Sequence, residues 1–411
     1  MKATRRQFFM GLASAFLPAL TKAQSHDLPP ARAITHGPKF HWFGYYDKLE
    51  FDPSGRYVLG MEVDFEHRSP KATDVIKVGM VDLEEGDRWI ELGESRAWNW
   101  QQGCMLQWLP GSKTEVVWND RQDDRFIAHV LDVKSREKRT LPGPIYSMSP
   151  DARWAISPDF SRLNDCRPGY GYTGIVDSNK NEQVPANSGI WRMDLHTGEK
   201  RLLFSLADIA KIPNPTRDGK AAKHYFNHLL FSPSGERFSF FHLWLWKDDT
   251  YWGRMFTANQ EGKELHLVNP GDCSHFWWRD PQHILAFAPH PSYGAKFYLF
   301  EDRTDKVQVL GPDVMIEDGH CSYLPGKRWI LNDTYPDKER KQHPYLFNVT
   351  NGKRYPLGHF HSPSAYEGEW RCDNHPRFSP DGRKVVIDSP HRGNGRQLYL
   401  IDISQIVSMD A

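Results

Sequence analysis

Four histidines occupy the same position in four similar sequence segments. They are His228 (NHLLFSP), His275 (SHFWWRDP), His320 (GHCSYLPG) and His375 (NHPRFSP), and each lies three residues before the aromatic residue that opens a turn motif. Equivalent positions of a repeat occupy equivalent places in space, so we expect the four side chains to converge on one region. Convergent imidazoles can bind a metal ion or transfer protons. The pattern therefore predicts a metal site or an acid–base site.

These segments belong to a longer series of repeats. Each repeat has an aromatic or apolar anchor, a turn rich in Pro, Asp and Gly, a β-rich run, and then a second hairpin-like segment. The seven anchors are 57, 40, 83, 47, 45 and 55 residues apart, at Phe51, Trp108, Met148, Phe231, Trp278, Tyr323 and Phe378. A period of about 40–50 residues with four short strands per unit is typical of a β-propeller blade. We therefore predict an all-β fold, a seven-bladed β-propeller in a single domain over about residues 30–405.

Three segments depart from the repeat. Residues 161–188 are rich in Gly, Pro, Asn and Asp, which predicts a long loop on one face of the ring. The last unit shows only three strands, and the segment ARAITHG at residues 31–37 is a candidate for the missing outer strand, because an open ring would leave two sheet edges exposed. SLADIAKI, at residues 205–212, is the one short segment that reads as an amphipathic helix.

The N-terminus and the charge balance limit the class of protein. Residues 1–23 combine a charged start, an apolar run and small residues before a cleavage site, which predicts a signal peptide, and the paired Arg5 and Arg6 indicate the twin-arginine type. The alternative is an ordinary secretory signal; both predict a periplasmic or secreted protein that keeps no membrane span after cleavage. The formal net charge is zero and no basic patch recurs, which argues against nucleic acid as a partner. A single-domain propeller is compatible with a monomer.

The histidine register can be explained in two ways. In a propeller, the residue before the innermost strand of a blade lies at one mouth of the central channel. Three of the histidines, or three together with Asp373, could then bind a divalent metal such as Mn, Ca or Zn. Alternatively, each histidine braces its own blade through hydrogen bonds. The first three blades have Lys48, Met105 and Ile145 at this position. Because the blade does not require a histidine there, a functional site is favoured.

Other side chains could extend such a site. His242 follows His228 across one hairpin, in FSFFHLWLW, so we expect both to face the same cleft; a histidine packed among aromatic residues is the alternative. Trp244 could stack on a sugar ring, and Arg371 flanks the last register histidine together with Asp373. Cysteines lie within three residues of three register histidines and could add soft ligands; they are Cys273, Cys321 and Cys372. No GxSxG elbow, P-loop or dinucleotide fingerprint is present.

Residues from about 225 to 403 resemble the oligogalacturonate lyases, single-domain seven-bladed propellers that cleave short pectin fragments. NHLLFSPSGERFSFFHLW is similar to that family's GHPxF…FCHEGP hairpin, and GRMFTANQEGKE to its ARMWF-N-DG segment. SHFWW is similar to its THEFW, and NHPRFSP to its HPHPSF closing blade. One departure is that Asp373 replaces a family histidine, and another is that the family's glutamine ligand is replaced near Trp370.

The resemblance implies a function and a role for each matched residue. The chemistry would be metal-assisted β-elimination on a uronic acid, with an acidic oligosaccharide as substrate. The implied roles are a catalytic base at His228 or His242, metal ligands at His275, Asp373 and His375 with His320 in or beside the set, and carboxylate binding by Arg254 and Arg371. Two alternatives remain: a non-catalytic exported propeller that binds glycans or a protein partner, and a metal that only joins blades.

Overall fold

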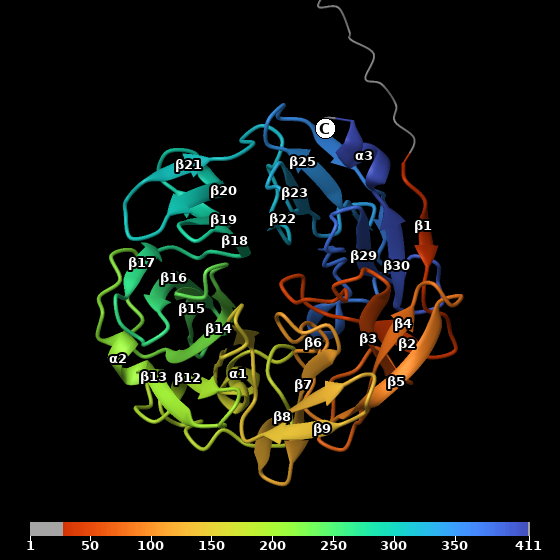
Figure 1. Cartoon of the computed structure of the whole chain (residues 1–411). Helices are drawn as coiled ribbons and strands as arrows, with labels where there is room; N and C mark the ends of the chain where they lie inside the picture. The colour runs from red at the N-terminus through yellow and green to blue at the C-terminus, as the bar shows by residue number, and fades with distance from the viewer. Residues whose placement is uncertain (1–27, 410–411) are drawn as a thin grey trace, which may run out of the picture.

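The computed structural model describes residues 28–409 and shows seven four-stranded antiparallel sheets arranged in a ring (Figure 1). The signal-peptide prediction and its paired arginines lie outside the described residues. The predicted all-β, seven-bladed propeller is confirmed. None of the helices among residues 28–409 is long and apolar enough to cross a membrane.

The blades follow one another along the chain, with the innermost strand first in each. Blade 1 consists of β2 (Phe40–Trp42), β3 (Tyr57–Val63), β4 (Ile76–Asp82) and β5 (Arg88–Ser95). Blade 2 consists of β6 (Gln107–Trp108), β7 (Glu115–Gln122), β8 (Arg125–Asp132) and β9 (Lys138–Leu141). Blade 3 consists of β10 (Ser147–Met148), β11 (Trp154–Ser157), β12 (Gly189–Asp194) and β13 (Lys200–Ser205). Blades 4 and 5 consist of β14 (Lys223–Phe231), β15 (Arg237–Leu245), β16 (Tyr251–Asn259) and β17 (His266–Asn269); and β18 (Phe276–Asp280), β19 (His283–His290), β20 (Gly294–Glu301) and β21 (Val307–Val309).

The last two blades complete the ring. Blade 6 consists of β22 (Ser322–Tyr323), β23 (Trp329–Asn332), β25 (Tyr345–Asn348) and β26 (Arg354–Pro356), and carries a two-stranded ribbon of β24 (Lys341–Gln342) and β27 (Phe360–His361). Blade 7 consists of β28 (Arg377–Phe378), β29 (Lys384–Ser389), β30 (Gln397–Asp402) and β1 (Ala31–Ala33). Strand β1 pairs antiparallel with β30, so the N-terminal segment supplies the missing outer strand, as the sequence suggested (Figure 1).

The repeated turn motif explains why each blade forms locally. Gly55, Gly235 and Gly382 occupy the same turn position and adopt φ of 74°, 75° and 68°, which a side chain would disfavour. The anchors Phe51 and Phe231 are buried and the anchor Phe378 is partly buried, and apolar residues of the following strands pack with them in the core. The turn and the alternating strand pattern are both local properties, which is why the period is readable in the sequence.

The innermost strand of blade 1 is interrupted. Strand β2 pairs with the far end of β3, whereas Phe51 pairs separately with Val58 near the start of that strand. The intervening residues 43–50 leave the sheet edge, and the rings of Tyr45 and Tyr46 reach histidines of other blades. This insertion fills the centre of the ring.

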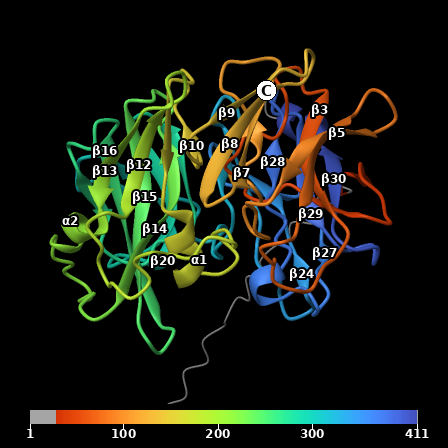
Figure 2. The same cartoon turned by 90° about the horizontal axis from the view of Figure 1, so that it is seen from below.

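The segment predicted as a loop at residues 161–188 contains a helix. Helix α1 (Phe160–Cys166) begins at Asp159, whose side chain accepts hydrogen bonds from the backbone N–H groups of Ser161 and Arg162. The remainder, residues 167–188, contains no strand. Figure 2 shows α1 on the same face of the ring as the β24–β27 ribbon. The short helix predicted within residues 205–212 is present as α2 (Leu206–Ala210). Within residues 28–409, the other short helices are η1 (Gly368–Trp370) and α3 (Ser404–Ser408).

Candidate functional site

The four register histidines gather around one tyrosine ring at the centre of the propeller. The ring centroid of Tyr45 lies 5.1 Å from His228, 6.5 Å from His275, 6.1 Å from His320 and 5.2 Å from His375. All four imidazoles are buried. We call this region, bounded by the four histidines and Tyr45, the funnel. Equivalent positions in four consecutive blades thus meet in one place.

Three of the histidines form a continuous arc. The centroids of His275 and His320 are 4.2 Å apart, and those of His320 and His375 are also 4.2 Å apart. His228 lies on another side of Tyr45, against Tyr170. The funnel therefore has the arc of three histidines on one side and His228, in contact with Tyr170, on another.

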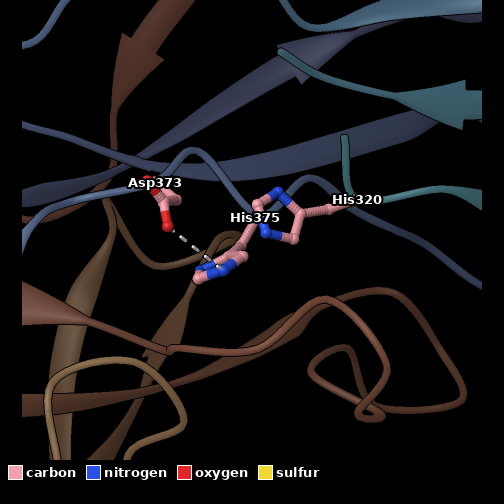
Figure 3. A group of neighbouring side chains, drawn as sticks. All are labelled: His320, Asp373 and His375. Atoms are coloured by element: carbon pink, nitrogen blue, oxygen red, sulfur yellow. Dashed lines mark ion pairs between the residues drawn. The ribbon is translucent and has the colours of Figure 1, made fainter. Parts of the chain in front are cut away.

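A possible metal site lies within the arc. His320, Asp373 and His375 each offer one ligand atom, and these atoms all lie within 4.8 Å of one another (Figure 3). His375 Nε2 is 4.0 Å from Asp373 Oδ2. Two buried nitrogens, His320 Nε2 and His375 Nε2, have no hydrogen-bond partner among residues 28–409. Unpaired buried polar atoms are costly, and two imidazole nitrogens beside a carboxylate suit a divalent cation. The residues present therefore fit a metal.

Carboxylates behind the arc orient its imidazoles. Asp333 lies 2.9 and 3.0 Å from His320 Nδ1 through its two oxygens, and it accepts hydrogen bonds from the backbone N–H groups of His320 (2.8 Å) and His375 (3.1 Å). Asp318 Oδ1 lies 3.0 Å from His275 Nδ1. A carboxylate that accepts from Nδ1 fixes the tautomer and leaves Nε2 free as a ligand. The buried carboxylate of Asp333, in blade 6, also connects that blade to His375 at the start of blade 7.

The same contacts set the protonation of the arc. Burial, followed by the charges of neighbouring groups, holds the pKa of His375 well below its ordinary value. Burial also lowers the pKa of His275 by more than Asp318 raises it. Burial would lower the pKa of His320 as well, but the charge and hydrogen bond of Asp333 outweigh it, and this pKa is raised. Two of the three imidazoles are therefore held neutral, the form that binds a metal.

A guanidinium connects the possible metal site to the tyrosine side of the funnel. Arg371 Nε donates to Asp373 Oδ2 at 2.7 Å, and Arg371 Nη2 donates to the Tyr170 hydroxyl at 2.7 Å. A second cation, Arg167, lies with its guanidinium carbon 4.6 Å from the centroid of the Tyr170 ring. The funnel thus carries two arginines that a substrate carboxylate could approach.

Local backbone geometry turns His228 into the funnel. Its φ is 52°, and the register of β14 against β15 shifts between Asn227 and Leu230. Met105 and His375, at the same register position in other blades, also have positive φ, at 57° and 41°. After the shift, the His228 ring packs against Phe241 of β15, at 5.3 Å. Burial, followed by neighbouring positive charges, holds the pKa of His228 well below its ordinary value.

His242 faces the other side of the same hairpin, contrary to the expectation of one shared cleft. It follows Phe241 in β15, and side chains alternate between the faces of a strand. Its Nε2 lies 2.9 Å from His224 Nδ1, and its Nδ1 accepts from Arg254 Nε at 3.2 Å. The register shift at His228 is the physical reason, because it breaks the alternation that would put both histidines on one face.

The other two residues predicted on this hairpin lie with His242. Arg254 donates to the backbone carbonyls of Ile209, Ile212 and Pro213, at and beyond the end of α2. Trp244 is buried and stacks on His224, with centroids 5.7 Å apart. In this structure neither side chain reaches the funnel: the arginine holds a loop, and the tryptophan has no free face for a sugar.

Several funnel residues were not expected from the sequence. Tyr45 comes from the blade 1 insertion, and Arg167 and Tyr170 come from the segment predicted as a loop. The 83-residue step between the anchors Met148 and Phe231 is a signal that could have indicated Arg167 and Tyr170, whereas Tyr45 lies outside that step. The cysteines near the register histidines are free and buried, and none belongs to the possible metal group among the described residues.

Comparisons with known proteins agree on the fold. No family model matches the chain, and no curated protein matches it by sequence. Among solved structures, an oligogalacturonate lyase in complex with manganese is similar with a TM-score of 0.66 at 17% identity, covering 92% of this chain and 94% of that one. An oligogalacturonate lyase from Vibrio parahaemolyticus gives a TM-score of 0.64 at 13% identity, with the same coverage. The β-propeller domain of the Trilobed protease from Pyrococcus furiosus gives 0.50 at 11%, covering 88% and 96%. The resemblance to oligogalacturonate lyases is thus confirmed for the fold.

Proposed function

We propose that this protein is a metal-dependent lyase that cleaves uronate-containing oligosaccharides by β-elimination. The observation that carries the proposal is the pair of buried, unpartnered nitrogens, His320 Nε2 and His375 Nε2, grouped with Asp373 at the centre of the ring. The structural neighbour named as an oligogalacturonate lyase in complex with manganese supports both the reaction and the kind of metal.

The metal would be held by His320, Asp373 and His375, with His275 next to them in the arc. A divalent cation bound there would neutralise the uronate carboxylate and so favour removal of the proton on the adjacent carbon. Manganese, calcium and zinc remain the candidates. The harder carboxylate of Asp373, in place of an imidazole, favours a cation that accepts oxygen ligands.

The arginines and the mouth of the funnel would bind the sugar. Arg371 presents a planar guanidinium beside Asp373, and its side chain keeps about a quarter of its surface exposed, at 27%. A planar fork matches a carboxylate in two hydrogen bonds. Tyr335 is 37% exposed, and its ring centroid lies 5.8 Å from that of His320. It could therefore stack on a sugar ring, the role that the sequence suggested for Trp244. A substrate carboxylate would therefore be held between Arg371 and the metal site.

His228 is the base that the geometry supports best. It belongs to the funnel, and its pKa is held well below the ordinary value, so the imidazole is neutral and able to accept a proton at neutral pH. His228 would remove the C5 proton, the C5–H electron pair would form the C4–C5 double bond, and the C4–O bond would break. His242 is already hydrogen-bonded at both ring nitrogens, to His224 and Arg254. It has no free nitrogen to act as a base in this arrangement.

We also propose that the chain is exported to the periplasm or secreted, on the strength of its predicted signal peptide, and that it is a monomer. The ring closes within one chain through β1 and β30, so no second subunit is needed to cover a sheet edge. Light scattering of the mature protein in solution would measure the mass; a dimer would contradict the second point.

The test of function is a product screen. Purified protein, supplied with Mn²⁺, is incubated with oligouronates of several linkages while absorbance in the near ultraviolet is followed. β-Elimination leaves a 4,5-unsaturated uronate that absorbs there, so a rise with at least one substrate is expected. Tight binding of an oligouronate with no absorbance change on any substrate would favour a non-catalytic glycan-binding propeller.

A further inference from the structure

Tyr170 stands opposite the proposed base in the funnel. The rings of Tyr170 and His228 meet edge to face, with centroids 5.7 Å apart. Tyr170 comes from the segment between α1 and β12, within blade 3, and is almost fully buried. Two groups that could exchange protons with a substrate are therefore brought into contact from different elements.

The hydroxyl of Tyr170 is held as an acceptor and keeps its own proton available. Arg371 Nη2 donates to this oxygen at 2.7 Å. Arg371 is held in turn by Asp373, to which its Nε donates at 2.7 Å. Among residues 28–409, none accepts a hydrogen bond from the Tyr170 hydroxyl. The phenolic proton is therefore free to be donated to a group that enters the funnel.

Positive charge surrounds the phenol on two sides. Arg371 contacts its oxygen, and the Arg167 guanidinium carbon lies 4.6 Å from its ring centroid. Burial alone would raise the pKa of Tyr170, but the charges of Arg371 and Arg167 and the hydrogen bond from Arg371 outweigh it, and the pKa lies below its ordinary value. The site is therefore built to stabilise a phenolate in a buried position.

The other tyrosines of the funnel lack this environment. The Tyr45 hydroxyl also has no partner among the described residues, but burial, followed by the neighbouring phenols of Tyr46 and Tyr170, raises its pKa well above the ordinary value. Tyr335 is partly exposed, yet desolvation by the surrounding residues and then the charge of Asp373 raise its pKa as well. Among residues 28–409, no guanidinium donates a hydrogen bond to Tyr45 or Tyr335 as Arg371 does to Tyr170. Tyr170 is thus the phenol best prepared to lose a proton.

We infer that Tyr170 is the general acid of the elimination and that it protonates the leaving oxygen while His228 takes the proton from carbon. This inference rests on the proposed lyase function and adds a catalytic residue to it. In the proton transfer to the leaving oxygen, Arg371 and Arg167 are positioning residues, because they act through the phenol of Tyr170.

The step balances without any further reactant. The C5–H bond breaks, its proton goes to the His228 imidazole, and its electron pair becomes the C4–C5 π bond. The C4–O4 bond breaks as its electron pair moves to O4, and O4 takes the phenolic proton of Tyr170. The enzyme is left with a protonated His228 and a Tyr170 phenolate, and transfer of one proton between them through solvent restores the starting state.

The test compares Tyr170→Phe with wild type on two uronates that differ only at C4. One carries a sugar as leaving group, and the other carries fluoride, which leaves without being protonated. The variant keeps the ring that contacts Arg167 and His228 and loses only the hydroxyl. Tyr366→Phe is the matched control, because its hydroxyl donates to Glu66 at 2.7 Å outside the funnel. Thermal unfolding shows that both variants are folded.

With the sugar leaving group, we expect kcat of Tyr170→Phe to fall by about 100-fold or more, and kcat of Tyr366→Phe to stay at the wild-type value. With fluoride, Tyr170→Phe should recover to within a few-fold of wild type. A wild-type kcat for Tyr170→Phe on the sugar substrate, or an equal loss on both substrates, would overturn the general-acid assignment while leaving the lyase function standing. Absence of unsaturated product from wild type on both substrates would overturn the lyase function and this inference together.

Discussion

Replacing the buried carboxylate behind the arc tests whether the funnel is built to hold a metal. Asp333 is fully buried and binds His320 Nδ1 together with the backbone N–H groups of His320 and His375. Asp333→Asn removes the charge and turns one acceptor oxygen into a donor amide. One of the two backbone donors then loses its partner, and the His320 ring loses its fixed tautomer. Both effects act on the atoms that would bind the cation.

The size of the effect follows from these contacts. Losing a carboxylate that orients a ligating histidine weakens metal affinity by about 10- to 100-fold. This corresponds to about 1.4 to 2.7 kcal/mol of binding free energy. The unpaired backbone N–H should also lower the free energy of unfolding of the metal-free protein by about 1 to 3 kcal/mol. Asp333→Asn is therefore expected to lose both affinity and stability.

Isothermal titration of the metal-stripped protein with Mn²⁺ measures the affinity. Asp280→Asn is the matched control, because Asp280 Oδ1 lies 2.8 Å from His283 Nδ1 at a similar histidine–carboxylate pair outside the funnel. Asp333 also raises the pKa of His320 and so favours the protonated imidazole, which cannot bind the metal. The titrations are therefore run near pH 8, about 1.5 units above the ordinary pKa of an imidazole. Equal Mn²⁺ affinity in wild type, Asp280→Asn and Asp333→Asn would refute the reasoning.

Three further predictions concern the base, the carboxylate site and the buried ion pair between Glu50 of blade 1 and Arg377 of blade 7. His228→Gln should lower kcat by about 100-fold with unchanged metal content by elemental analysis; wild-type turnover would remove His228 as the base. Arg371→Lys should raise KM for the oligouronate by about tenfold, because one ammonium cannot replace the guanidinium that contacts Asp373 and Tyr170 together; an unchanged KM in steady-state kinetics would contradict this. Burial, only partly offset by Arg377, raises the pKa of Glu50 to about 7. The folded state then holds a proton that the unfolded chain has lost, so this group's contribution to stability falls as pH rises toward about 7. Glu50→Gln should flatten that part of the Tm-against-pH curve, and an identical curve would count against it.

The fold could be predicted because its signals are local. The anchor, the left-handed turn glycine such as Gly235, and the alternating strand pattern recur within each blade, so a single sequence shows the period. The closing strand β1 follows from the need to cover two sheet edges. Helix α1 was missed because it is seven residues long and depends on one cap, Asp159, inside a stretch rich in Gly, Pro and Asn.

The candidate site was only partly readable for a different reason. The repeat places His228, His275, His320 and His375 in equivalent positions, so their convergence follows from the period alone. The direction of a side chain, however, depends on backbone details such as the register shift beside His228, which separates it from His242.

Residues outside the repeat have no register to indicate where they lie. Tyr45 comes from an insertion in the first blade, and Arg167 and Tyr170 come from the segment after α1. Their place in the funnel is set by tertiary contacts with histidines of other blades and with Arg371. The sequence period therefore predicts that the four register histidines converge, but it does not predict which residues fill the centre of the propeller.

The most direct test of the central claim is the metal dependence of elimination by the purified protein. Near-ultraviolet absorbance is followed on an oligouronate that wild type cleaves, before chelation, after chelation, and after Mn²⁺ is restored, in wild type and in His320→Ala/His375→Ala. We expect product formation to stop on chelation, to return with Mn²⁺ in wild type, and to stay absent in the double variant while its fold persists by circular dichroism. Elimination that continues undiminished in the chelated protein or in the double variant would contradict the account.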